Sequence, residues 1–155
     1  MSSKHLLIIA HAPSQHTRQL LAGLAAGARY PEVAGVEARV LGAFETQPAD
    51  VIGAQAVVLM TPENLGYMSG ALKDCFDRCY YPCLERTEAM PYAMLIRAGH
   101  DGTGTRQAIE SITTGLRWRP VHAPVICRGP WCADFVDQAT QLGMYLAAGL
   151  ELRML

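Results

Sequence analysis

Hydroxyl and imidazole side chains gather in a short polar segment, His11-Ala-Pro-Ser-Gln-His-Thr17, directly after an apolar run. Pro13 ends the run, and Ser14 stands where the N-cap of a following helix belongs. A phosphate dianion placed there would meet free backbone N–H groups, the hydroxyls of Ser14 and Thr17 and the positive end of the helix dipole. The residues alone leave two interpretations open: a phosphate cradle, or a helix cap with Thr17 packed against the sheet.

The elements that must position this segment follow from hydrophobic patterning. Short apolar runs indicate strands buried on both faces, at residues 5–10, 36–41, 56–60, 92–96 and 121–127. Longer segments with helical spacing separate them, such as the one carrying Leu20, Leu24 and Ala28. This alternation predicts the α/β class, with a five-stranded parallel sheet, right-handed crossovers and helices on both faces. A very short helix is compatible with residues 42–50.

Two further polar segments follow predicted strands, so they belong to the same edge of the sheet as the first. They are Thr61-Pro-Glu-Asn-Leu-Gly-Tyr-Met-Ser-Gly70 and Ala98-Gly-His-Asp-Gly-Thr-Gly104. In open parallel sheets, ligands bind outside the carboxyl ends of the strands, where the strand order reverses. We call residues 11–17 loop one, 61–67 loop two and 98–102 loop three, and we expect function there.

The stretch Thr61-Pro-Glu-Asn-Leu-Gly-Tyr-Met-Ser-Gly-Ala-Leu-Lys-Asp-Cys-Phe-Asp-Arg78 resembles flavodoxin-like FMN proteins. The likeness is to the NAD(P)H-dependent FMN reductase branch, whose loop reads Thr/Ser-Pro-x-Tyr/Asn-x-Gly-x-x-Ser-Gly-x-Leu-Lys-x-x-x-Asp-Arg. Loops one and three resemble the phosphate loop and the third flavin loop of that family. Loop one departs from the flavodoxin pattern T/S-x-T-G-N-T because it contains no glycine. The resemblance implies strand order 2-1-3-4-5, in which the three loops meet in one crevice.

The resemblance also implies a cofactor, FMN, with its phosphate at loop one and its ring between loops two and three. Backbone groups near residues 64–67 and 99–102 would bond the polar edge of the ring, and glycine permits that close approach. Tyr67 either stacks on the ring or serves as a structural or interface tyrosine. The expected cofactor-binding residues are His11, Ser14, Gln15, His16, Thr17, Thr61, Pro62, Glu63, Asn64, Leu65, Gly66, Tyr67, Ala98, Gly99, His100, Asp101 and Gly102.

The resulting functional hypothesis is an FMN-binding oxidoreductase. It takes hydride from NAD(P)H and passes electrons to a small acceptor such as a quinone or free flavin, and no side chain is assigned as a catalytic acid or base. Two alternatives stay open: a flavodoxin-like electron carrier without NAD(P)H turnover, and an FMN-binding regulatory protein. A strongly acidic docking surface, which carriers use toward basic partners, is not expected at a net charge of −1.

Composition excludes several other classes. The 155 residues suffice for one domain, taken as residues 1–155, and 50% of them are hydrophobic against 17% charged, which favours a homo-oligomer. No basic stretch suits nucleic acid, no apolar run is long enough for a membrane span, and Met1-Ser2-Ser3-Lys4 opens no secretory signal. A cytoplasmic location is expected, with five unpaired cysteines.

Cys75, Cys79 and Cys83 recur every four residues, but Pro82 predicts a helix end near Tyr80, so no metal site is expected.

Overall fold

A computed structural model describes residues 3–155; Met1 and Ser2, which belong to the N-terminal prediction above, lie outside the described residues. The strands are β1 (Lys4–Ala10), β2 (Val36–Gly42), β3 (Ala56–Asn64), β4 (Tyr67–Met68), β5 (Pro91–Ala98), β6 (Arg119–Pro120) and β7 (Val125–Arg128). The helices are α1 (Gln15–Ala28), α2 (Pro48–Ile52), α3 (Gly70–Cys83), α4 (Thr103–Gly115) and α5 (Asp134–Glu151). The short α2 lies at the end of the segment for which a very short helix was considered.

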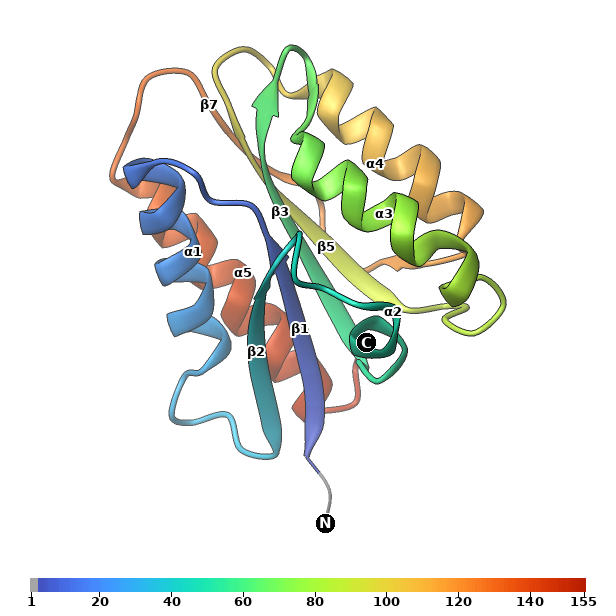
Figure 1. Cartoon of the computed structure of the whole chain (residues 1–155). Coiled ribbons are helices and arrows are strands. Elements are labelled where there is room, and N and C mark those ends of the chain that lie inside the picture. Colours follow the sequence, from blue (N-terminus) through green and yellow to red (C-terminus); the bar gives the residue numbers. More distant parts are fainter. Residues whose placement is uncertain (1–2) are drawn as a thin grey trace.

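The sheet runs in the order β2-β1-β3-β5-β6, with β7 also paired to β5, and all of these pairings are parallel. Strand order reverses at β1, which lies between β2 and β3 (Figure 1). The predicted fold class is therefore confirmed. Among the described residues the sheet contains seven strands rather than five, because β4 is added to β3 and the fifth position is divided between β6 and β7.

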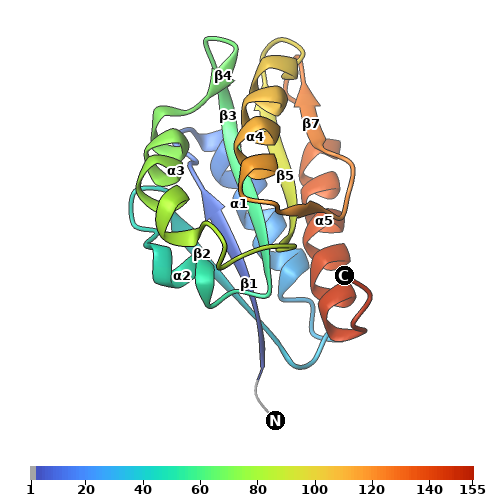
Figure 2. The same cartoon turned by 90° about the vertical axis from the view of Figure 1, so that its right-hand side faces the viewer.

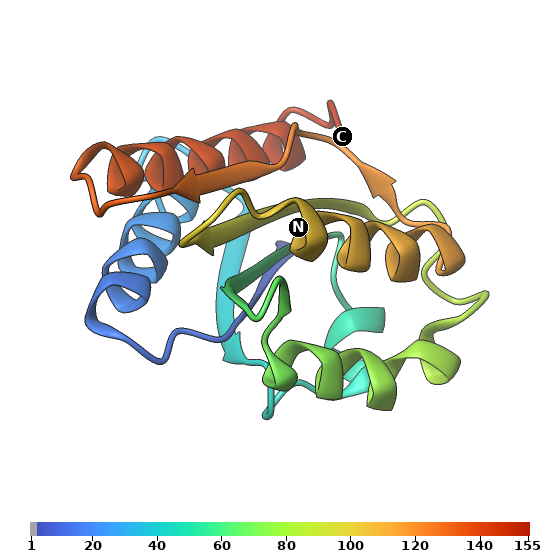
Figure 3. The same cartoon turned by 90° about the horizontal axis from the view of Figure 1, so that it is seen from above.

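Helices cover both faces of the sheet (Figure 3). Alternate strand residues explain the two layers, because successive side chains of a strand point to opposite faces. Leu7, Ile9 and Leu59 pack with α3 and α4, whereas Leu6, Ile8 and Val58 pack with α1 and α5. All six side chains are buried. The central strands β1 and β3 contain apolar runs because both of their faces are covered. The prediction that residues 36–41 form a strand buried on both faces was wrong, because β2 lies at the edge of the sheet and its Glu37 and Arg39 are exposed.

The predicted strand at residues 56–60 continues to Asn64 and turns back as β4. Pro62 was expected in loop two and not in a strand, and proline donates no ladder hydrogen bond. It is tolerated because β1 ends at Ala10, opposite Met60, so Pro62 has β5 beside it but no longer β1. Loop two is therefore mostly a β-hairpin, whose turn is Leu65-Gly66.

Helix α3 also runs further than expected. Pro82 lies inside it, and the helix ends at Cys83 instead of near Tyr80. The prediction was wrong because a proline in the last turn removes a single helical N–H, while Leu84 still donates its own N–H to the carbonyl of Tyr80 at 2.9 Å.

Helices α1 and α5 pack with their backbones close together. A Cβ atom added at Gly27 would overlap the carbonyl of Thr140, and one added at Gly143 would overlap the carbonyl of Leu24. Glycine at these positions therefore allows a contact that alanine would not. The contact fixes the direction of α1, and with it the position of loop one.

No helix within residues 3–155 combines the length and the apolar character needed to cross a membrane.

Candidate functional site at the carboxyl edge of the sheet

Loops one, two and three leave neighbouring strands, since β1 pairs with β3 and β3 pairs with β5. Figure 2 shows the β3–β4 hairpin beside the loop that leads into α4, at the carboxyl ends of the strands. The exposed predicted site residues are Ser14, Gln15, His16, Asn64, Leu65, Gly66, Tyr67, Gly99, His100 and Asp101. His11, Pro62 and Glu63 are half-buried, and Thr17, Thr61, Ala98 and Gly102 are buried.

Loop one forms a capping box at the start of α1. The Oγ of Ser14 accepts the N–H of Thr17 at 3.1 Å, and the Oγ1 of Thr17 accepts the N–H of Ser14 at 2.9 Å. The N–H groups of Gln15 and His16, like those of any first helical turn, have no acceptor within the helix. The first turn of α1 contains no acidic residue. This helix start therefore combines a cap with two N–H groups suited to an anion.

His16 connects loop one with Trp131, a residue distant from it in the sequence. Its imidazole stacks parallel to the indole of Trp131, with ring centroids 4.2 Å apart and an interplanar angle of 4°. Trp131 also contacts Phe135 of α5 edge to face. The guanidinium of Arg97 lies 5.8 Å from the Trp131 centroid and 5.3 Å from that of Phe135. Trp131 thus holds the His16 ring in place beside the start of α1.

Loop two is held rigidly by its own hydrogen bonds. Leu65 and Gly66 have φ of 54° and 74°, which suits the two-residue turn of a β-hairpin. The buried Thr61 hydroxyl accepts the N–H of Ser69 at 2.9 Å and donates to the carbonyl of Pro62 at 2.8 Å, so it is committed to the hairpin. Leu65 and Tyr67 extend outward, with relative exposures of 105% and 41%. The tip therefore offers backbone groups and apolar surface to a ligand.

Loop three is joined to loop two by a side chain. The two carboxylate oxygens of Glu63 accept the N–H of His100 at 3.0 Å and the N–H of Gly102 at 2.9 Å. Asp101 accepts the N–H of Thr103, and this backbone hydrogen bond lowers the pKa of the Asp101 carboxyl. Glu63 was expected to contact the cofactor; in the structure its carboxylate contacts loop three.

The three loops are joined unequally. Loops two and three form one unit, whereas loop one is connected through the hydrogen bond from the His11 N–H to the Met60 carbonyl, at 3.1 Å. Among residues 3–155, no side-chain hydrogen bond links loop one to the other two. A ligand that contacts all three loops would therefore connect loop one with the unit formed by loops two and three.

A cavity of about 360 Å³ opens beside loop one, on its β2 side. Phe44, with an exposure of 64%, stands at its rim, and the ring of His11 meets it edge to face at 6.3 Å. Arg18 lines the cavity as well and donates to the carbonyl of Pro13 at 3.2 Å. Phe44 was not among the predicted site residues. Its position shortly after the second predicted strand, at the carboxyl edge of the sheet, was the signal that could have identified it.

Thr105, in the first turn of α4, was also missed. Its side chain is fully buried, and in the described part of the chain its hydroxyl is the buried side-chain group left without a hydrogen-bond partner. A buried hydroxyl without a partner costs free energy, so this atom is suited to a ligand or a water molecule.

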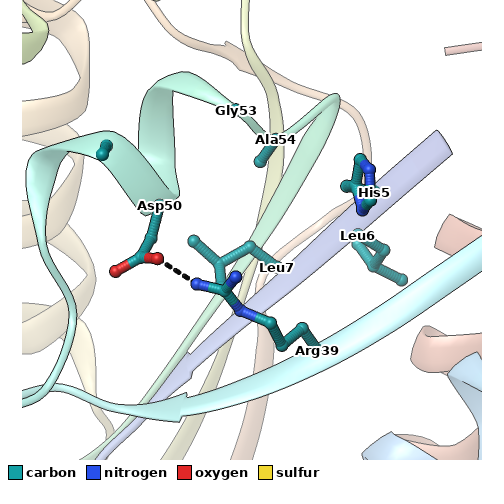
Figure 4. A pocket seen from close by; sticks show the side chains of 8 residues that line it. His5, Leu6, Leu7, Arg39, Asp50, Gly53 and Ala54 are labelled. Atoms are coloured by element: carbon teal, nitrogen blue, oxygen red, sulfur yellow. Dashed lines mark hydrogen bonds and ion pairs between the residues drawn. The ribbon is translucent and has the colours of Figure 1, made fainter.

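A second cavity, of about 260 Å³, lies at the opposite end of the sheet (Figure 4). It is lined by His5, Leu6, Leu7, Arg39, Ala49, Asp50, Gly53 and Ala54. Its main charged groups, Arg39 and Asp50, form an ion pair with each other. Because the amino ends of the strands lack the loops that bind ligands in such sheets, this cavity is not the candidate site.

The cysteines form no metal centre in the described residues, where no group of three or more His, Cys, Asp or Glu side chains is placed to hold an ion. Cys75, Cys79 and Cys83 are buried along α3. Burial raises the pKa of Cys83 to about 11. The interaction between the neighbouring thiols of Cys75 and Cys79 lowers the pKa of Cys79 and raises that of Cys75.

Comparison with known proteins bears on the fold. No protein-family model matches this chain, and neither does any curated protein sequence. Solved structures do match. A flavodoxin from the domain Archaea superposes with a TM-score of 0.80 at 11% identity, over 95% of this chain and 99% of that one. A flavodoxin, WrbA-like protein from Agrobacterium tumefaciens superposes with a TM-score of 0.71 at 12% identity, over 98% and 99%.

A third match is to part of a longer protein. Rubredoxin oxygen:oxidoreductase from Desulfovibrio gigas superposes with a TM-score of 0.79 at 11% identity, over 99% of this chain but 37% of that one. At these identities the comparisons establish the architecture. The chain has the flavodoxin-like fold.

Proposed function

We propose that this chain, as a single domain, binds FMN at the carboxyl edge of its sheet and catalyses electron transfer from NAD(P)H to a small acceptor such as a quinone or free flavin. The observation that carries the proposal is the arrangement of loops. A capped helix start without acidic residues follows β1, the strand at which strand order reverses. The rigid unit of loops two and three follows the neighbouring strands β3 and β5.

The residues present fit FMN. Its phosphate would be held by the N–H groups of Gln15 and His16 and by the Ser14 hydroxyl, with the ring of His16 fixed beside it by Trp131. Its ring would lie between loops two and three, where backbone groups of residues 65–67, Gly99 and Asp101 would be available to its polar edge. FMN, when bound, supplies the acceptance of hydride and the transfer of electrons.

The protein's own contribution is binding, orientation and access. Tyr67 and Leu65 present apolar surface at the hairpin tip, and Gly99 adds no side chain, so the loops leave room for a flat donor or acceptor beside the ring. The resemblance of residues 61–78 to the FMN reductase branch supports a reductase over a carrier.

The test begins with the purified chain. Titrations with FMN, FAD and riboflavin are expected to show micromolar or tighter binding of FMN and weaker binding of the other two. NADH or NADPH should then bleach the visible absorption of the complex, and an added quinone should sustain turnover. Failure of both FMN and FAD to bind would refute the proposal. Binding without NAD(P)H oxidation, and with reduction in two resolved one-electron stages, would instead identify an electron carrier.

A further inference from the structure

Glu63 bonds to backbone groups of loop three, beside which the flavin ring is proposed to bind. It is the second-last residue of β3, and it is separated from its partners His100 and Gly102 by 37 and 39 positions in the sequence. Each carboxylate oxygen accepts one N–H, at 3.0 and 2.9 Å. Hydrogen bonds to a charged acceptor are about twice as strong as neutral ones. This contact is therefore the main polar connection between loops two and three.

The surroundings leave loop three little freedom to rearrange. Gly102 has φ of 71°, and a Cβ there would lie 2.6 Å from Ile126. A Cβ at Gly104 would overlap the carbonyl of Gly66, so the hairpin tip lies directly against the start of α4. Loop three is thus fixed by the close contact of Gly102 with the Ile126 side chain and by Glu63, and the adjoining start of α4 packs against the hairpin tip.

We propose that Glu63 is a positioning residue of the flavin site: its carboxylate fixes the amide groups of loop three, and its charge makes the site favour oxidised over reduced flavin. This inference rests on the proposed function. The ring would lie between the two loops that Glu63 joins, so its polar edge would lie near the carboxylate. Reduction adds negative charge to that edge at neutral pH, and a neighbouring carboxylate disfavours it.

The first arm of the test uses the protein without flavin. Hydrogen exchange is measured at the amides of residues 100 and 102 in the wild type and in Glu63→Gln and Glu63→Ala. Glu63→Ala removes both acceptors, and exchange at these two amides should accelerate at least tenfold. Glu63→Gln keeps one acceptor oxygen and should give an intermediate rate. Glu32→Gln, which changes an exposed carboxylate in the loop between α1 and β2, is the matched control and should leave both rates unchanged.

The second arm measures dissociation constants for oxidised and reduced FMN, together with the reduction potential of the complex. In Glu63→Gln, oxidised FMN should bind within about threefold of wild type. The ratio of oxidised to reduced dissociation constants should rise about tenfold, which for a two-electron couple raises the potential by about 30 mV. Glu63→Ala should weaken oxidised FMN at least tenfold, and Glu32→Gln should change neither quantity.

The two arms separate the possible failures. If Glu63→Ala leaves amide exchange at residues 100 and 102 unchanged, the positioning role is wrong, whatever the flavin does. If exchange accelerates but Glu63→Gln keeps the wild-type potential, the effect of the charge on the ring is wrong. If the wild type binds no flavin, the proposed function fails and this inference fails with it, while the exchange data still report on the contact between the loops.

Discussion

Replacing Ser14 by aspartate separates the two tasks that the start of α1 could perform. The Ser14 Oγ accepts the N–H of Thr17 and caps the helix. Aspartate is about as good an N-cap as serine, and its charge interacts favourably with the positive end of a helix whose first turn has no acidic residue. The free energy of unfolding of Ser14→Asp should therefore stay within about 0.5–1 kcal/mol of wild type.

Phosphate binding should respond very differently. A phosphate monoester carries about −1.5 to −2 charges at neutral pH. Two unit charges about 4 Å apart interact by roughly 1 kcal/mol in water and roughly 4 kcal/mol at an effective dielectric constant of 20. The repulsion therefore costs at least about 2 kcal/mol, which weakens FMN about 30-fold. Riboflavin lacks the phosphate and should bind Ser14→Asp as it binds the wild type.

The assay is a pair of titrations, with FMN and with riboflavin, supported by urea denaturation of each variant. Ser14→Ala serves as the comparison, because it loses the cap at a cost of about 1 kcal/mol without adding a charge. If Ser14→Asp binds FMN as tightly as the wild type, no phosphate lies at the start of α1. Equal losses for FMN and riboflavin would mean that loop one shapes the pocket without holding the phosphate.

Three further outcomes follow from the packing. Gly27→Ala should lower the free energy of unfolding by about 3 kcal/mol, because its Cβ would overlap the Thr140 carbonyl, whereas Gly70→Ala, which has open space, should be neutral in the same denaturation assay. Thr105→Val should raise that free energy by about 1 kcal/mol by removing a buried hydroxyl without a partner, and a clear loss would show that the hydroxyl has a partner in solution. With iodoacetamide at pH 8, only the exposed Cys132 should react quickly, because the other four cysteines are buried and burial also raises the pKa of Cys83 and of Cys127 to about 11; a fast phase that persists in Cys132→Ser would contradict this.

The sequence was sufficient for the architecture because hydrophobic periodicity reports burial directly. The run at residues 56–60 is apolar on both faces, and β3 is indeed covered on both faces. The predicted element ends were wrong at two prolines, because the rule that proline ends a strand or a helix was overridden by the packing of the folded chain. Pro62 lies in a strand and Pro82 in a helix. At both positions the missing N–H removes a single backbone hydrogen bond, and the neighbouring residues keep the element intact.

The geometry of the candidate site was less predictable because its contacts are distant in sequence. Glu63 and His100 were both expected in the site, yet nothing in their spacing indicates that one accepts a hydrogen bond from the other. The stacking of His16 on Trp131 joins residues from opposite ends of the chain. Hydrophobic periods of two residues and of nearly four residues assign residues to strands and to helices. Side-chain pairing between loops depends instead on how those strands and helices pack.

The contact between α1 and α5 also has a consequence for the order of folding. One face of the sheet is covered by a helix near the N-terminus and by another at residues 134–151. During synthesis, Leu6, Ile8 and Val58 therefore stay incompletely covered until α5 has emerged from the ribosome. Pairing across more than 100 residues is slow to form, and apolar strands left open in the meantime favour aggregation. Ribosome-bound chains that stop short of α5 are expected to need chaperones, and emergence of α5 is expected to cover this face of the sheet.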